Sequence, residues 1–219
     1  MKKRAMIFFT ICIIVVVSLV IALVYLLNII PHNQYENIDF NIETYKSEVD
    51  KDGDGLDDQT DMLTSVRKYI ETKPVYKSKY YATGYPDDQY GVCTDVVAFG
   101  MKNTGYDLME LVNQDIINHR ENYNIETVDK NIDFRRVRNL NVYFKNNIIS
   151  LTTDLSEIKE WQGGDIIVFK DHIGVISDKR NRKGIPFLIH HANPVQVNYE
   201  EDVLEFYGQD YIIGHYRIS

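Results

Sequence analysis

The stretch "DIIVFKDHIGVISDKRNRKGIPFLIHHA", residues 165–192, holds three short segments that are rich in β-branched and aromatic residues and separated by turns. Such segments are typical of β-strands. The pattern predicts strands over 165–169, 172–177 and 186–192, and a fourth over 211–218, "YIIGHYRI". Because the connections are short, we expect these strands to pair antiparallel.

The sequence before these strands has a helical period. Apolar residues recur at helical spacing over 62–70 and 107–117, from Thr94 to a stop at Gly105, and again within 131–146. Helices come first and strands follow, which predicts an α+β domain with helices packed on an antiparallel sheet.

The N-terminus predicts a membrane anchor. Residues 6–30 form an uncharged run of 25 residues, long enough, at roughly 37 Å as a helix, to cross a bilayer. A cleaved signal peptide is the alternative, but its apolar core would be shorter. Lys2, Lys3 and Arg4 should stay cytoplasmic, which places the C-terminal domain of this single-pass protein outside the cell. We therefore expect a tip and anchor over 1–30, a stalk over 31–49 and one domain over 50–219.

Charge and cysteine content narrow the classes of function. The chain carries −8 overall, and its first thirty residues contribute three positive charges, which leaves −11 for the rest. Such an acidic domain argues against nucleic acid as a partner. Cys12 lies in the predicted anchor, so Cys93 has no partner within the chain, and a lone extracellular cysteine suggests a reactive thiol.

Cys93 lies where a polar loop meets the predicted helix from Thr94. A helix N-terminus and a neighbouring imidazolium lower a thiol pKa, and we expect this for Cys93. His172, which opens a predicted strand, is the candidate general base. His190, His191 or Asn193 could orient its ring, and His190 is the natural neighbour in the next strand.

Several motifs together resemble the NlpC-type, papain-like cell-wall peptidases and amidases. They are "GVCTDV", "GGDIIVF", "HIGVISD" and "FLIHHA", with "DDQTD", "GYPDD", "NIDFRRVRNL" and the terminal "HYR" extending the resemblance over about 50–219 to uncharacterised NlpC-like bacterial proteins. The resemblance implies a papain-like fold with Cys93 as nucleophile, His172 as base and His190 as orienting residue. It also implies cleavage of amide bonds in peptidoglycan stem peptides, without a cofactor in the chemistry.

Three further residues are candidates for substrate binding. Tyr85 could line the cleft, although packing in a Gly-Tyr-Pro turn explains it equally well. Arg135 and Arg136 could bind a stem-peptide carboxylate through paired hydrogen bonds, or could simply pair with nearby acids.

Residues 50–61, "DKDGDGLDDQTD", fit a calcium-binding loop. The template takes ligands at positions 1, 3, 5, 7, 9 and 12 with glycine at position 6, and Gly55 stands at position 6. The ligands would be Asp50, Asp52, Asp54, the Leu56 carbonyl, Asp58 and Asp61. We expect a structural Ca²⁺ here; the alternative is a solvated turn in which Asp58 or Thr60 caps the next helix.

Two other functions compete with the hydrolase. An acyltransferase or transglutaminase-like enzyme would use the same thiol but pass the acyl group to an amine. A calcium-loaded cell-wall-binding module would need no reactive thiol at all. Nothing in the sequence indicates an oligomeric state.

Overall fold

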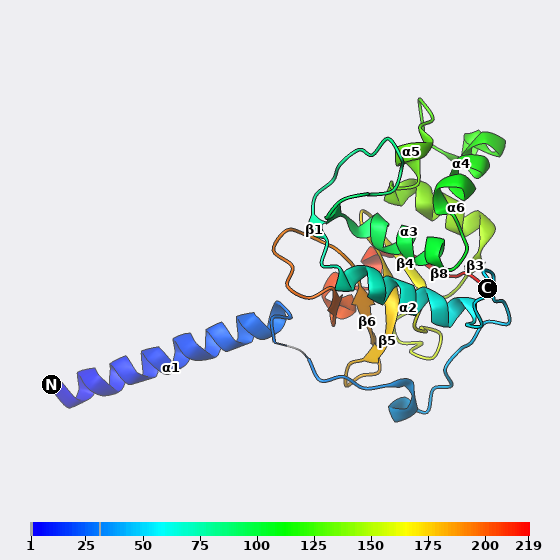
Figure 1. The fold of residues 1–219 in the computed structure, drawn as a ribbon. Coiled ribbons are helices and arrows are strands. Elements are labelled where there is room, and N and C mark those ends of the chain that lie inside the picture. Colours follow the sequence, from blue (N-terminus) through cyan, green and yellow to red (C-terminus); the bar gives the residue numbers. More distant parts are fainter. Residues whose placement is uncertain (1, 31) are drawn as a thin grey trace. The chain divides into compact units, whose positions relative to one another are not determined.

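The computed structural model describes residues 2–30 and 32–219. The chain divides after Asn33 into two compact units, each of which is described by itself. The first contains helix α1 (Lys2–Leu26), and the second, Gln34–Ser219, contains the remaining elements of the described chain (Figure 1).

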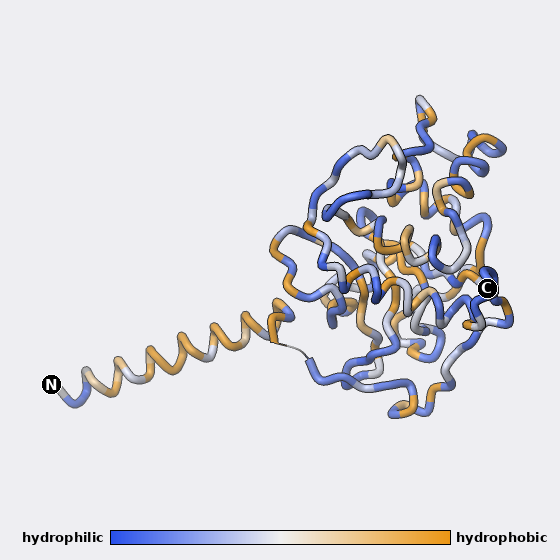
Figure 2. Tube along the Cα trace, viewed as in Figure 1, coloured by the Kyte–Doolittle hydropathy of each residue, from blue (hydrophilic) through white to orange (hydrophobic). Residues whose placement is uncertain are grey.

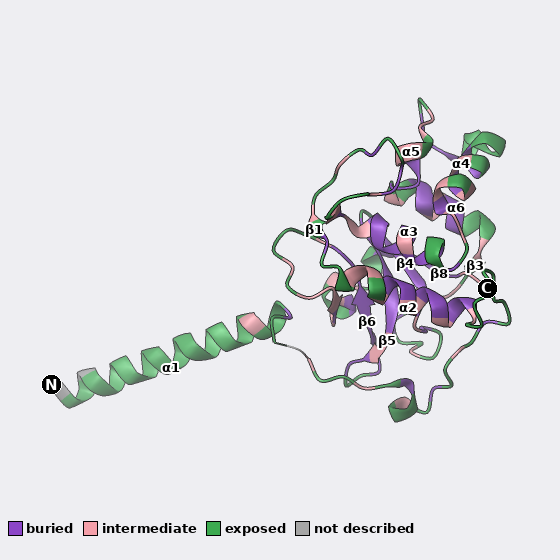
Figure 3. Ribbon diagram, viewed as in Figure 1, coloured by how far each residue is buried: buried purple, intermediate pink, exposed green. Residues whose placement is uncertain are grey.

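Helix α1 begins with three charged residues and is apolar from Met6 onward. Its segment Met6–Leu26 has 21 residues, which is roughly 31 Å of helix. The apolar residues cover all sides of the helix (Figure 2) and their side chains are exposed (Figure 3). Length and composition are compatible with a membrane span or a signal anchor.

The second unit is a mixed α/β domain built on an antiparallel sheet, as the sequence predicts. The strands lie in the order β3-β8-β4-β5-β6-β7, and each neighbouring pair is antiparallel. Their bounds are β3 (Ile149–Ser150), β4 (Ile166–Phe169), β5 (Ile173–Arg180), β6 (Pro186–Ile189), β7 (Glu200–Glu201) and β8 (Ile212–Arg217). Strand β6 is shorter than predicted, so His190 and His191 lie just beyond its end.

The helices also follow the predicted periodicity, with one difference. The segment 131–146 is divided into two helices, because Phe134 ends one and Arg136 caps the next. The bounds are α2 (Asp58–Glu71), α3 (Cys93–Asn103), α4 (Leu108–Asn118), α5 (Lys130–Asp133), α6 (Val137–Asn147) and α7 (Leu204–Tyr207), with 3₁₀ turns η1 (Asn37–Phe40), η2 (Arg120–Asn122) and η3 (Gln209–Tyr211). A small parallel pair, β1 (Val75–Tyr76) and β2 (Tyr90–Gly91), leads into α3.

Both faces of the sheet are buried. Alternate residues of β4 divide between two hydrophobic clusters: Ile166 and Val168 pack with the helices, and Ile167 and Phe169 pack with Trp161 on the opposite face. The purple strands in Figure 3 show this burial. Helix α3 packs on α2 and on β5, which holds the start of α3 against the start of β5.

The segment predicted as a stalk is largely part of the domain. Tyr35 exchanges backbone hydrogen bonds with Arg180, and Asn37 bonds Gln162 at 3.0 Å. The hydroxyl of Tyr45 donates to the carbonyl of Ser219 at 2.6 Å. Residues from Gln34 onward therefore belong to the second compact unit, which includes most of the predicted stalk.

Candidate active site

Cys93 is the first residue of α3. Val92, in an extended conformation, caps the helix, and its N–H donates to Oδ2 of Asp95 at 2.8 Å. The buried residues Val96 and Val97 hold the helix against the core, while Cys93 is half-buried at its start. The sequence therefore places the thiol at a helix N-terminus, as predicted.

The carboxylate of Asp95 is fully buried and paired with Arg135. Nε and Nη2 of Arg135 donate to the two carboxylate oxygens at 2.6 and 2.9 Å, and Nη1 donates to the Lys79 carbonyl at 2.7 Å. This guanidinium joins the loop before α6 to the helix that carries the thiol. Each of its nitrogens is occupied, so the predicted role of Arg135 in binding a substrate carboxylate does not fit its surroundings.

His172 lies immediately before β5 and His190 immediately after β6. Nε2 of His172 and Nδ1 of His190 are 2.8 Å apart, and Nε2 of His190 is 3.0 Å from Oε2 of Glu201. Gly174 allows this close approach, because a Cβ at that position would lie 3.1 Å from the Cβ of His190. The three side chains form a buried relay with a carboxylate at one end.

The carboxylate decides which nitrogens carry protons. Since Glu201 only accepts, Nε2 of a neutral His190 donates to it, and Nδ1 of His190 must accept from Nε2 of His172. Nδ1 of His172 then keeps a free lone pair. It has no hydrogen-bond partner in the described part of the chain, and His172 as a whole is 9% exposed.

Burial keeps both imidazoles neutral. It lowers the pKa of His172 to about 3, with the neighbouring His190 adding to the effect, and it lowers the pKa of His190 to about 3. A neutral His172 with an open Nδ1 can accept a proton, but a pKa of about 3 makes it a weak base until a negative charge forms beside it.

The thiol does not show the lowered pKa that its helix position led us to expect. Burial, and then the charge of Asp95, raise the pKa of Cys93 to about 11, against the opposing effect of nearby backbone N–H groups that include that of Ile173. The thiol thus lies beside the residue that follows His172. Within the described chain it makes no hydrogen bond to the His172 ring, so thiol and imidazole are both neutral at rest.

Glu201, Tyr76 and Tyr207 are site residues that the sequence did not reveal. The Tyr207 ring stacks on His172, with centroids 6.0 Å apart. Burial raises the pKa of Tyr76 and that of Tyr207, the latter to about 12, and a charge on Cys93 contributes in both cases. Two half-buried phenols therefore lie near the sulfur. No sequence motif marks these three residues. The available signal for Glu201 is its place in β7, the short strand that pairs with β6.

The other candidates lie outside this cluster of contacts. Tyr85 is buried against Phe99 and Phe134, and its hydroxyl donates to Asp107 at 2.9 Å, which is the structural alternative for that residue. Arg136 is exposed near Asp133. His191 packs edge-on against Tyr76 and Tyr199, and Asn193 is exposed, with its side chain accepting from the backbone of Val195. Only His190 of the three candidate orienting residues contacts His172.

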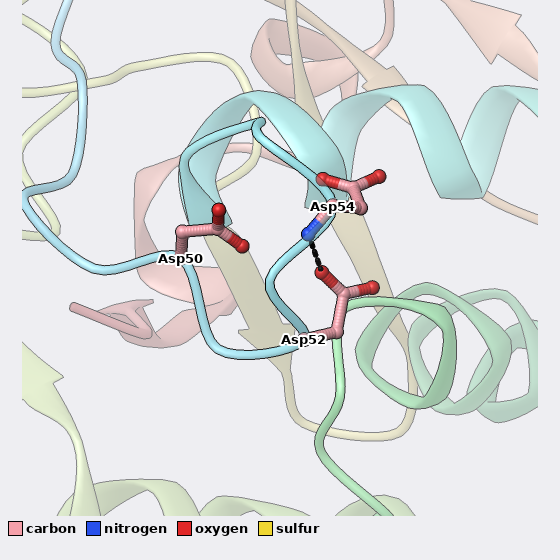
Figure 4. A group of neighbouring side chains, drawn as sticks. All are labelled: Asp50, Asp52 and Asp54. Atoms are coloured by element: carbon pink, nitrogen blue, oxygen red, sulfur yellow. Dashed lines mark hydrogen bonds between the residues drawn. The ribbon is translucent and has the colours of Figure 1, made fainter.

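The acidic loop is a separate feature. Oxygen atoms of Asp50, Asp52 and Asp54 lie within 4.8 Å of one another on an exposed turn (Figure 4), and Leu56 is exposed beside them. Asp58 and Asp61 belong to the first turn of α2, and both are buried. The six predicted ligands are thus divided between the loop and the helix.

Comparisons with known proteins identify relatives of this chain. A domain of unknown function, DUF1287, matches residues 63–218, a range that includes the thiol, both histidines and Glu201 and begins just after the acidic loop. The uncharacterized protein YijF of Escherichia coli strain K12 is 33% identical over 153 residues, which cover 66% of this chain and 72% of YijF. No solved structure matches.

Proposed function

We propose that this chain, which belongs to the DUF1287 family of domains of unknown function, is a membrane-anchored cysteine hydrolase with a papain-like, NlpC-type fold. Its substrates are amide bonds in the stem peptides of peptidoglycan. The observation that carries the proposal is the relay from Glu201 through His190 to His172, which leaves Nδ1 of His172 open beside the segment that contacts Cys93.

The first half of the reaction forms an acyl-enzyme. Sγ of Cys93 attacks the amide carbon while its proton passes to Nδ1 of His172, and the carbonyl becomes a tetrahedral oxyanion. The first N–H groups of α3 have no partner within the helix and can donate to this oxyanion. The imidazolium of His172 then protonates the leaving nitrogen, the C–N bond breaks, and a thioester remains on Cys93.

The second half releases the acid. Nδ1 of His172 takes a proton from water, the hydroxide attacks the thioester, and the proton returns to the sulfur as the C–S bond breaks. During both halves His190 holds the ring of His172 in place. Glu201, through His190, stabilises the positive charge that forms on His172.

Because the Cys93 thiol and the His172 ring are both neutral at rest, the proton must move from sulfur to nitrogen during the attack on the amide. In a thiolate–imidazolium pair the charges exist beforehand, whereas burial here favours the uncharged thiol and the uncharged ring. Substrate binding must therefore bring the amide, Sγ and Nδ1 together before the proton moves, and this requirement favours a selective hydrolase over a generally reactive thiol.

The substrate assignment depends on location and resemblance. The apolar segment Met6–Leu26 of α1 follows three positive residues, which favours an external C-terminal domain. The motifs around Cys93, His172 and His190 resemble those of NlpC-type enzymes that cleave cell-wall peptides. Peptidoglycan stem peptides are the abundant amides on that side of a bacterial membrane.

Digestion of purified peptidoglycan tests this proposal. Sacculi are incubated with the full-length chain in detergent, and the soluble products are analysed by mass spectrometry. We expect new fragments that differ by one water across an amide bond, with Cys12→Ser fully active and Cys93→Ser inactive. Identical product profiles for all three proteins would remove the hydrolase reading. A product that carries an added amine in place of water would indicate the transferase.

A further inference from the structure

The loop before α2 is arranged around its acidic side chains. Oδ1 and Oδ2 of Asp50 accept from the N–H groups of Gly53 and Gly55 at 2.8 and 3.0 Å, so the turn closes over the first carboxylate. Asp52 and Asp54 face the same turn, and oxygens of all three lie within 4.8 Å of one another (Figure 4). Three carboxylates held this close repel one another unless a cation lies between them.

A fourth carboxylate, on α2, gives an independent indication. Asp61 is 4% exposed, and its Oδ1 accepts from the Ser65 hydroxyl at 3.2 Å. Its Oδ2 is sealed from solvent and has no hydrogen-bond partner in the described part of the chain. Asp61 lies in the first turn of α2, the helix that follows the loop, at position 12 of the calcium-loop template. A sealed, unpartnered carboxylate oxygen is costly unless something compensates it.

One predicted ligand does not fit. Oδ1 of Asp58 accepts from the Lys51 N–H at 2.8 Å, and Oδ2 accepts from the Tyr106 hydroxyl at 2.5 Å. Both oxygens are therefore committed to holding the loop against the turn after α3. Position 9 of the loop therefore supplies no direct ligand, and the template commonly fills this position through water.

We propose that Ca²⁺ binds to this loop through Asp50, Asp52, Asp54, the carbonyl of Leu56 and Oδ2 of Asp61, with water completing the coordination. The donors are all oxygens, and Ca²⁺ takes six to eight of them in flexible geometry. Mg²⁺ requires near-octahedral geometry and dehydrates reluctantly. Asp61 is one methylene shorter than the usual Glu at position 12, so it contributes one oxygen while the other bonds Ser65.

The ion joins three parts of the domain. The loop packs on Gly105, where an added Cβ would lie 3.1 Å from Lys51 and 3.2 Å from Asp52. Asp61 belongs to α2, and Gly105 follows α3, the helix that begins with Cys93. Calcium thus stabilises the packing of these two helices and takes no part in the chemistry of the thiol. The site begins before the range matched by the family, and it stands independently of the proposed hydrolase.

Calorimetric titration of the full-length chain in detergent, freed of metal by chelation, tests this site. We expect Ca²⁺ to bind with a Kd of about 10⁻⁴–10⁻³ M and 10 mM CaCl₂ to raise the Tm by about 3–11 °C. Asp52→Asn and Asp61→Asn should each weaken binding at least about tenfold. Asp87→Asn, an exposed acid outside the loop, makes the same charge change and should bind as the wild type does.

Three results would overturn the site. The first is no binding heat and no Tm shift up to 10 mM CaCl₂. The second is an equal effect of MgCl₂ and CaCl₂ at matched ionic strength. The third is unchanged Ca²⁺ binding by both Asp52→Asn and Asp61→Asn. Circular dichroism without calcium confirms that each variant is folded. Asp52 is exposed, so its variant remains informative if Asp61→Asn fails to fold.

Discussion

The pH dependence of Cys93 alkylation tests the electrostatics of the site without any substrate. In the folded chain burial, and then Asp95, raise the pKa of the thiol from 9.0 to about 11. Below both values this lowers the thiolate fraction about 100-fold relative to an ordinary thiol, because each pKa unit is a factor of ten. Only the thiolate reacts with iodoacetamide. We therefore predict that the logarithm of the alkylation rate rises with unit slope up to pH 10 and shows no plateau.

The assay uses the full-length Cys12→Ser chain in detergent, with labelling followed by intact-mass spectrometry between pH 6 and 10. The criterion is the position of the plateau, which does not depend on how accessible the sulfur is. Circular dichroism at each pH confirms the fold. His172→Ala should leave the slope unchanged, because burial and Asp95 set the pKa. A plateau below pH 9 that His172→Ala abolishes would refute this reasoning and establish a thiolate–imidazolium pair.

Three further predictions concern the residues around the thiol. Glu201→Gln should lower the rate of peptidoglycan cleavage about 10²–10⁴-fold, because an amide can donate to His190 and reverse the tautomers of the relay; product masses measure this. Arg135→Met should lower the free energy of unfolding in urea by about 3–5 kcal/mol, because Asp95 is left buried and unpaired. Stability should fall between pH 6.5 and 4.5. Burial lowers the pKa values of the buried His172, His190 and His191 to between about 3 and 4, so below pH 6.5 the unfolded chain binds more protons than the folded chain. Replacing one of them, His191→Phe, should reduce the slope by up to about 1.4 kcal/mol per pH unit.

The first two of these predictions have matched control variants, and the third has an outcome that would contradict it. Glu205→Gln, on the exposed side of α7, should cleave peptidoglycan at the wild-type rate. If Glu201→Gln also cleaves at the wild-type rate, the relay is not used. Arg136→Met should change stability by less than about 0.5 kcal/mol, since Arg136 is exposed. A stability that stays constant from pH 6.5 to 4.5 would contradict the neutral state of the buried histidines.

Local pattern was enough to predict the antiparallel sheet and its helices. The alternation in "DIIVF" and the helical spacing from Thr94 reflect which faces are buried, and burial is what the structure shows for both. Pattern also placed Cys93 at a helix start. These features depend on neighbours within a few residues, where periodicity carries the information.

Features that depend on distant pairing could not be predicted. Glu201 reaches His190 because a two-residue strand adds to β6, and so short a strand has no periodicity to detect. Arg135 meets Asp95 across 40 positions of sequence. The thiol pKa has the opposite direction from the prediction, because the helix terminus was visible in the sequence and the desolvation of the sulfur was not.

The segment from Gln34 to Ser47 has a practical consequence for anyone who produces the domain in isolation. The fully buried guanidinium of Arg180 donates to the side chain of Asn37 at 2.5 Å, and the hydroxyl of Ser47 lies 2.5 Å from that of Ser219. A gene fragment trimmed to the family boundaries, 63–218, would remove these partners together. It would leave an interior cation short of an acceptor, so insoluble expression of such a fragment would say nothing about the proposed activity. An affinity tag attached after Ser219 would disturb the contacts of Ser219 with Tyr45 and Ser47, so the tag is better placed at the start of the chain.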